Sequence, residues 1–159
     1  FVKREANGFF TLEEVPSSRD LWLLGTGTGI APYFSMLKTD EPWERFERVV
    51  LVHAVRQDSD LRYQALIEEL SMTYGDRFVF QAFVSREEIE GTLHGRIPEA
   101  ITRGELETAT GIEISAEHSQ FMLCGNPDMV ADTTEALKGR GLSKNRRRTP
   151  GQITVEKYW

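Results

Sequence analysis

The chain has 159 residues, 40% hydrophobic and 28% charged, which is typical of one ordinary folded domain. Its net charge of −6 argues against general nucleic-acid binding, and its one cysteine excludes an internal disulfide or a cysteine-ligated cluster; with three scattered histidines, we expect no metal. No apolar run approaches the roughly 20 residues that span a bilayer and no signal-peptide pattern opens the chain, so we expect a cytoplasmic protein without membrane contact.

The first predicted elements are a strand, a glycine turn and the start of a helix. Residues 20–24 form a short apolar run that stops at Gly25. A turn over residues 25–29 leads to Pro32, which suits the first turn of a helix because its missing N–H has no partner to lose there. This order is typical of a βα unit.

Strands and helices then alternate to the end of the chain. Further strands are predicted at Val49–Val52, Phe78–Val84, Phe121–Cys124 and Ile153–Val155, and helices at Leu61–Tyr74, Pro98–Leu106 and Pro127–Gly139. Asn126 is the expected N-cap of the last helix. Such alternation predicts an α/β fold, doubly wound, with a five-stranded parallel sheet flanked by helices.

The glycine turn carries the most specific motif. In open α/β sheets, ligands bind beyond the carboxyl ends of the strands, where glycines let the backbone approach a phosphate. The spacing here is neither the common dinucleotide fingerprint nor a Walker A loop. The full string Gly25-Thr26-Gly27-Thr28-Gly29-Ile30-Ala31-Pro32 resembles the signature of the NADP(H)-binding domain in the ferredoxin–NADP⁺ reductase superfamily.

Two other segments match the same family in the same order. Cys124-Gly125-Asn126-Pro127 is similar to its cysteine-glycine turn, although a lone Cys124 would more often be a small buried thiol. The terminal segment 155–159 resembles bacterial reductases that end in an aromatic pair, here Tyr158-Trp159. Gly8-Phe9-Phe10 resembles the tail of a flavin domain, so we expect residues 1–16 to be the tail of an N-terminal FAD-binding barrel and residues 17–159 to be the NADP(H)-binding domain.

The resemblance implies an FAD-dependent oxidoreductase that exchanges hydride between NADP(H) and FAD and single electrons with ferredoxin or flavodoxin, the isolated fragment being inactive. It implies that residues 25–29, with Gly125 and Asn126, bind the nucleotide and that Cys124 and Glu156 border the nicotinamide. Tyr158 would stack on the flavin, and Trp159 would lie against the FAD adenosine.

Three arginines favour NADP(H) over NAD(H). An NAD site usually places a carboxylate after the second strand, whereas an NADP site places cations there for the 2′-phosphate. Arg56 follows that strand, while Arg86 and Arg96 follow the next one. In the bacterial reductases that the chain resembles, arginines at matching positions hold this phosphate, although a single Arg is more often a solvated surface residue.

A basic run near the end of the chain is a candidate docking surface for the acidic electron carrier. Its members are Lys144, Arg146, Arg147 and Arg148. A solubilising charge run is an equally good interpretation. The alternatives are the reductase component of an oxygenase, a flavin reductase of the same superfamily, and a non-enzymatic nucleotide-binding module. The sequence leaves the oligomeric state open, with a monomer as the default expectation.

Overall fold

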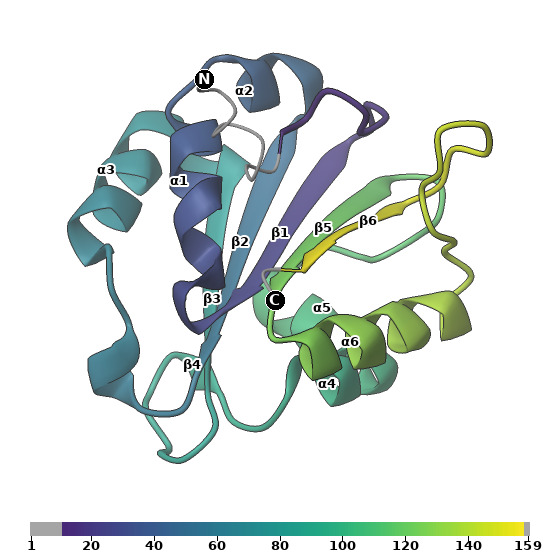
Figure 1. The fold of residues 1–159 in the computed structure, drawn as a ribbon. Helices are drawn as coiled ribbons and strands as arrows, with labels where there is room; N and C mark the ends of the chain where they lie inside the picture. Colours follow the sequence, from purple (N-terminus) through teal and green to yellow (C-terminus); the bar gives the residue numbers. More distant parts are fainter. Residues whose placement is uncertain (1–10, 158–159) are drawn as a thin grey trace, which may run out of the picture.

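The computed structural model of the protein describes residues 11–157 and forms three layers around one parallel sheet (Figure 1). The sheet has six strands in the order β4-β3-β2-β1-β5-β6. Their bounds are β1 Asp20–Thr26, β2 Arg48–Val55, β3 Phe78–Val84, β4 Thr92–Leu93, β5 Ser119–Gly125 and β6 Ile153–Lys157. The expected α/β class and the five strands are confirmed, but the number was one too low. The additional β4 has only two residues, which pair with Ala82 and Phe83 at the sheet edge and form no recognisable run.

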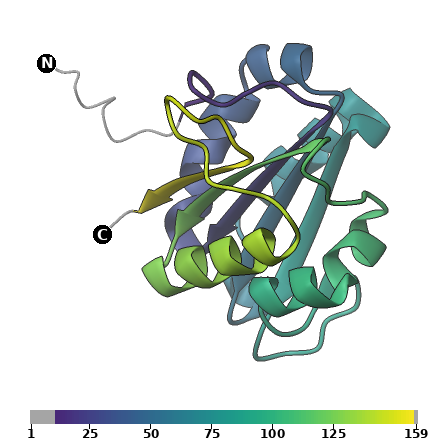
Figure 2. The ribbon, with the colours of Figure 1, turned by 90° about the vertical axis from the view of Figure 1, so that its right-hand side faces the viewer.

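Helices cover both faces of the sheet. They are α1 Ala31–Leu37, α2 Glu41–Arg45, α3 Gln64–Tyr74, α4 Ile97–Arg103, α5 Glu105–Thr110 and α6 Pro127–Gly139, with short 3₁₀ turns at Gly27–Ile30, Asp58–Asp60 and Gly75–Arg77. Figures 1 and 2 show α1, α2 and α3 on one side and α4, α5 and α6 on the other. No helix within residues 11–157 has both the length and the hydropathy needed to cross a bilayer.

Two of the predicted helices differ from the observed ones. The helix expected over residues 98–106 is divided into α4 and α5, because Gly104 is left-handed at φ 78°. The helix expected from Leu61 begins at Gln64, because Leu61 is extended and Tyr63 has φ 67°. By contrast, α6 has the predicted bounds, since Pro127 opens it and the Asn126 side chain accepts hydrogen bonds from two backbone N–H groups of its first turn.

Alternating side chains of β1 supply both halves of the core. Leu21 and Leu23 pack with α1, α2 and α3, whereas Trp22 and Leu24 pack with α4, α5 and α6. Each is fully buried, which stabilises the fold by about 1.5–3 kcal/mol per large apolar side chain. Continuous apolar strands are expected where a parallel sheet is covered on both faces.

The chain reverses its winding direction at β1. The strands β2 and β3 lie on one side of β1, and β5 and β6 lie on the other. The Tyr33 hydroxyl of α1 lies 2.8 Å from the Leu24 carbonyl oxygen and 2.9 Å from that of Met122, so this helix is tied to both β1 and β5. A switch point of this kind leaves a crevice beyond the carboxyl ends of the strands.

Candidate functional site

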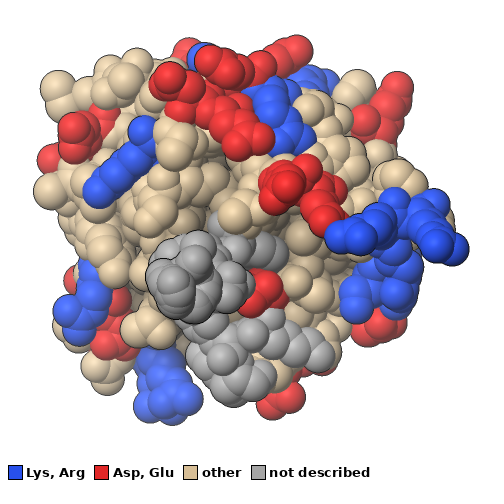
Figure 3. All heavy atoms as spheres, turned by 45° about the horizontal axis from the view of Figure 1, so that its top comes forward, with Lys and Arg blue, Asp and Glu red and all other residues tan. Residues whose placement is uncertain are grey.

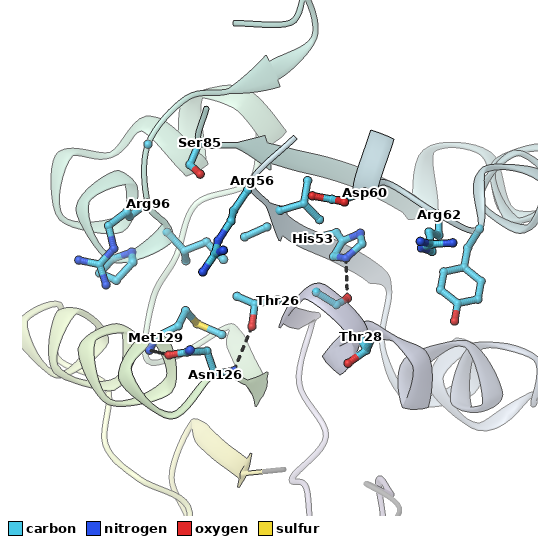
Figure 4. Close-up of a pocket in the computed structure, with 17 residues that line it drawn as sticks. Thr26, Thr28, His53, Arg56, Asp60, Arg62, Ser85, Arg96, Asn126 and Met129 are labelled. Carbon is cyan, nitrogen blue, oxygen red and sulfur yellow. Dashed lines mark hydrogen bonds between the residues drawn. The ribbon is translucent and has the colours of Figure 1, made fainter. Parts of the chain in front are cut away.

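A pocket with a volume of about 580 Å³ occupies this crevice (Figure 4). Its walls come from the ends of β1, β2 and β3, the β2–α3 connection and the starts of α4 and α6. The residues that line it are Thr26, Gly27, Thr28, His53, Ala54, Val55, Arg56, Asp60, Arg62, Tyr63, Ser85, Gly95, Arg96, Ile97, Pro98, Asn126 and Met129. The pocket therefore combines backbone turns, apolar walls and three arginines.

The glycine turn forms the floor of the pocket, and two of its glycines are required for different reasons. Gly27 has φ 52°, a conformation that favours glycine. Gly29 has no positive φ, but a Cβ there would lie 2.9 Å from both the Cys124 carbonyl oxygen and the Gly125 Cα. Close packing of two turns thus excludes a side chain at position 29.

A second turn, after β5, is attached to the first. The Thr26 Oγ1 accepts a hydrogen bond of 3.0 Å from the backbone N–H of Asn126. Gly125 has φ 133°, and a Cβ there would lie 2.3 Å from the same Oγ1. The two turns, 100 residues apart in sequence, therefore form one continuous backbone surface.

The ring of His53, near the end of β2, is hydrogen-bonded to the backbone of the glycine turn. Its Nε2 lies 2.9 Å from the Gly27 carbonyl oxygen, and since a carbonyl only accepts, Nε2 carries the proton. Burial lowers the pKa of His53, against smaller opposing effects of the Gly27 hydrogen bond and the Asp60 charge. Nδ1 is buried without a partner among the described residues, so protonation would bury a second, unpaired N–H. The ring is neutral at pH 7 and acts as a fixed donor.

The three arginines of the pocket differ in their partners. Figure 4 shows Arg56 pointing into the pocket, Arg96 at one edge and Arg62 at the opposite side, near Thr28. Within residues 11–157 the side chains of Arg56 and Arg62 have no hydrogen-bonding or ionic partner, and both are exposed. Arg96 instead pairs with the Asp132 carboxylate at 3.0 Å. Two free guanidinium groups beside a glycine turn make the pocket suitable for a phosphorylated ligand.

A family profile described as the oxidoreductase NAD-binding domain matches residues 23–135, from β1 to α6. The chain belongs to this family. The matched range includes the glycine turn, the second turn and the three arginines that line the pocket.

The curated relatives of this NAD-binding domain have longer chains. It is 49% identical over 159 residues to a flavodoxin/ferredoxin–NADP reductase of Shigella flexneri, covering 99% of this chain and 64% of that protein. A protein of the same name from Buchnera aphidicola of Schizaphis graminum is 43% identical over 160 residues, covering 100% of this chain and 62% of the relative. The chain thus spans less than two thirds of these proteins.

Solved structures with a similar fold also belong to longer chains. A ferredoxin NADP⁺ reductase from Neisseria gonorrhoeae with bound FAD and NADP has a TM-score of 0.88 and 36% identity, over 96% of this chain and 61% of that one. A cytochrome P450 reductase from Amycolatopsis has a TM-score of 0.66 and 26% identity, over 92% of this chain and 38% of that one. These comparisons confirm the resemblance that the motifs indicated.

The structure brings many of the predicted cofactor-binding residues of this NAD-binding domain together. Those that line the pocket are Thr26, Gly27, Thr28, Arg56, Arg96 and Asn126. Gly25, Gly29 and Gly125 are buried: Gly29 and Gly125 form the contact between the two turns, and Gly25 packs on Gly29 and Ile30 within the first turn. Arg86 is exposed and donates its backbone N–H to the Arg56 carbonyl at 2.9 Å, but it is not among the lining residues.

Two of the three predicted catalytic residues, Cys124 of β5 and Glu156 of β6, lie on neighbouring strands. Cys124 is fully buried, with Gly25 of β1 and Glu156 of β6 as its partners in register. Burial, with a smaller contribution from the Glu156 charge, raises the pKa of the Cys124 thiol to about 11. The thiol is therefore a neutral, weakly polar group rather than a nucleophile. Tyr158 and Trp159, like Gly8-Phe9-Phe10, lie outside the described residues.

Sequence reasoning missed the β2–α3 connection as a wall of the pocket. Tyr63 is the one non-glycine residue within 11–157 with positive φ, and its ring packs on Phe34 of α1 with centroids 4.6 Å apart. This contact places the backbone of the neighbouring Arg62 at the wall of the pocket. The signal was weak, because the sequence around Arg62 reads as an ordinary helix start with surface charges.

Proposed function

We propose that the chain is the NADP(H)-binding domain of an FAD-dependent flavodoxin/ferredoxin–NADP⁺ reductase. The observation that carries this proposal is Arg56, which follows β2 and points into the pocket without a partner among the described residues. At this place an NAD site has a carboxylate that bonds the ribose 2′-OH. A cation there favours a 2′-phosphate.

The residues around the pocket fit the nucleotide. Arg56 and Arg96, with Arg86 beside them, are proposed to hold the 2′-phosphate. The surface made by Thr26, Gly27, Thr28 and Asn126 is proposed to lie under the pyrophosphate, since Gly27 has no side chain and lets a ligand approach the backbone there. Arg62 adds a further positive charge at the far side of this surface.

In the proposed reaction, the bound cofactors exchange a hydride between the nicotinamide and the flavin, and the protein's contribution is placement. Cys124 and Glu156 are proposed to border the nicotinamide at the β5–β6 side. A thiol with a pKa of about 11 neither repels the nicotinamide by charge nor reacts with it. The hydrogen bond from His53 holds the Gly27 carbonyl away from the phosphates above the turn.

A titration with 2′,5′-ADP and with 5′-AMP tests the NADP assignment, because the two ligands differ only in the 2′-phosphate. Loss of one charge-assisted hydrogen-bonding pair costs about 1.5–3 kcal/mol, so Arg56→Ala should weaken 2′,5′-ADP binding about 10- to 150-fold and leave 5′-AMP binding unchanged. Arg103→Ala, an exposed arginine at the end of α4 that does not line the pocket, is the control. Equal binding of both ligands by the unmodified chain would exclude the NADP(H) assignment.

The wider activity is proposed from the relatives. Proteins named flavodoxin/ferredoxin–NADP reductase share up to 49% identity with the chain, against 26% for the P450 reductase, which favours this activity over the reductase of an oxygenase. The chain covers 61% of a structure that holds FAD and NADP. We therefore assign FAD mainly to a separate barrel domain, with residues 1–16 as its tail. In the structure, Leu12 and Val15 pack into the core of the NADP(H)-binding domain itself. The domain boundary at residue 17 therefore stays a prediction.

The partners are proposed to be ferredoxin or flavodoxin. The basic segment, defined as Lys144, Arg146, Arg147 and Arg148, lies in the loop between α6 and β6, and Figure 3 shows Lys and Arg side chains gathered there. Arg147 pairs with Glu14 at 3.0 Å and is 83% exposed. Acidic carriers would be steered to such a surface. Neutralising the four residues in the full-length enzyme should reduce the salt dependence of electron transfer, and an unchanged dependence would exclude this docking surface.

A further inference from the structure

The Arg96 side chain is held at the edge of the pocket by carboxylates from two helices. Its Nη2 lies 3.0 Å from the Asp132 Oδ2 of α6, and its Nη1 lies 3.8 Å from the Glu99 Oε2 of α4. Neither carboxylate lines the pocket. In Figure 4 the Arg96 guanidinium accordingly lies at the edge, whereas Arg56 points inward.

These ion pairs are exposed and therefore exchangeable. The side chains of Arg96, Asp132 and Glu99 are 52%, 53% and 51% exposed, respectively. Pairs of this exposure are weak in water, and a phosphate dianion competes effectively with one carboxylate for a guanidinium. Arg96 therefore has two alternative partners: the Asp132 carboxylate in the empty pocket and an anionic ligand in the occupied one.

The carboxylates beside Arg96 oppose an anionic ligand, whereas most of the charged side chains that line the pocket favour one. Arg56 and Arg62 are the other cations that line the pocket, and Asp60 is the acidic lining residue. The Asp60 carboxylate is engaged by the Gln57 N–H at 3.2 Å, in the turn on the other side of the pocket. Asp132 and Glu99 are the carboxylates in contact with Arg96 itself, and together they offset its positive charge.

Resting on the proposed NADP(H) function, we propose that Asp132, assisted by Glu99, is a specificity-determining residue that acts through Arg96. It positions the guanidinium at the edge of the pocket and lowers its affinity for the 2′-phosphate. The physical effect is competition together with charge repulsion: the phosphate must displace Asp132 from Arg96 and remain within a few ångströms of two carboxylates. The nucleotide therefore binds less tightly, and dissociates faster, than it would if Arg96 had no carboxylate partner.

Removing the Asp132 charge should tighten binding selectively. For a unit charge about 6 Å from a phosphate at a half-exposed site, Coulomb repulsion screened by salt predicts that Asp132→Asn raises 2′,5′-ADP affinity about three- to fivefold at low ionic strength. The affinity for 5′-AMP, which lacks the 2′-phosphate, should not change. Glu99→Gln should act in the same direction with a smaller gain, because its oxygen lies further from Arg96.

A matched charge control lies on the same helix. Glu135 of α6 is 74% exposed, pairs with Lys138 at 3.5 Å and does not touch Arg96. Glu135→Gln therefore removes one negative charge without freeing the guanidinium, and it should leave the ratio of 2′,5′-ADP to 5′-AMP affinity unchanged. In an Arg96→Ala background, Asp132→Asn should give a smaller gain, because only the direct repulsion between carboxylate and phosphate is then removed, and the difference between the two gains measures the action through Arg96.

The calorimetric titration of these variants has distinct outcomes. A three- to fivefold gain for 2′,5′-ADP alone that is clearly smaller in the Arg96→Ala background supports the inference, and a gain of the same size in both backgrounds overturns it. If the unmodified chain prefers 2′,5′-ADP but Asp132→Asn binds it equally or more weakly, the inference is wrong and the proposed function stands. If the unmodified chain does not distinguish the two ligands, the proposed function fails and this inference fails with it. Near-ultraviolet circular dichroism confirms that each variant is folded.

Discussion

Replacing Gly29 with Ala places a methyl group between the two turns that form the pocket floor. The new Cβ would lie 2.9 Å from the Cys124 carbonyl oxygen and from the Gly125 Cα, and 3.2 Å from the Cys124 carbonyl carbon. All three are backbone atoms, so the contact is relieved only if the turns move apart. Overpacking of this kind costs about 1–3 kcal/mol of unfolding free energy, or a decrease in Tm of about 2–12 °C for a chain of this length. Because Gly29 has no positive φ, backbone strain adds nothing to this value.

Urea unfolding followed by circular dichroism measures the predicted loss, and a 2′,5′-ADP titration measures the damage to the pocket. Gly139→Ala is the matched control, since a Cβ at Gly139, the last residue of α6, meets nothing within 4 Å. This control should be neutral or stabilise by up to about 1 kcal/mol, because Ala is the better helix former. A Gly29→Ala chain as stable as the unmodified one, with unchanged nucleotide affinity, would refute the argument that the contact between the turns shapes the site.

Two further predictions concern titratable groups near the pocket. Burial lowers the pKa of His53 in the folded chain below its ordinary 6.5. Near pH 6.5 the unfolded chain therefore binds a proton at His53 that the folded chain does not bind. The free energy of unfolding should fall as the pH decreases through 6.5, until the folded-state pKa is reached. His53→Gln should flatten this part of the stability curve, measured by urea unfolding between about pH 7.5 and 5; an unchanged slope would assign the acid sensitivity elsewhere. The Cys124 thiol is fully buried and has a pKa of about 11, so it should resist iodoacetamide at pH 8 in the folded chain and react with it in urea. Mass spectrometry follows the labelling, and rapid labelling of the folded chain would contradict the burial of Cys124.

Much of the fold was predictable because its strands are continuous apolar runs. β3 has the predicted bounds, and so does α6, where Asn126 and Pro127 give a strong local start signal. The errors occur where tertiary contacts decide. The two residues of β4 become a strand only because β3 lies beside them, and Gly104 divides a helix that the apolar pattern reads as continuous.

The candidate site was predictable to the extent that its residues follow strands. The glycine turn and Arg56 come directly after β1 and β2, and the carboxyl ends of parallel strands meet at one edge of a sheet. The position of Arg62 depends on the packing of Tyr63 on Phe34, and the pairing of Arg96 with Asp132 depends on how α4 and α6 lie together. No local pattern encodes either contact.

The bond between Thr26 and the Asn126 N–H also has a consequence for protein synthesis. On the ribosome, the glycine turn emerges long before β5, and without Gly125 and Asn126 it lacks the backbone that it packs against in the finished domain. A nascent chain that has released β1, β2 and β3 therefore exposes an incomplete pocket floor. The pocket floor can therefore be complete only late in translation, after the two halves of the sheet have joined.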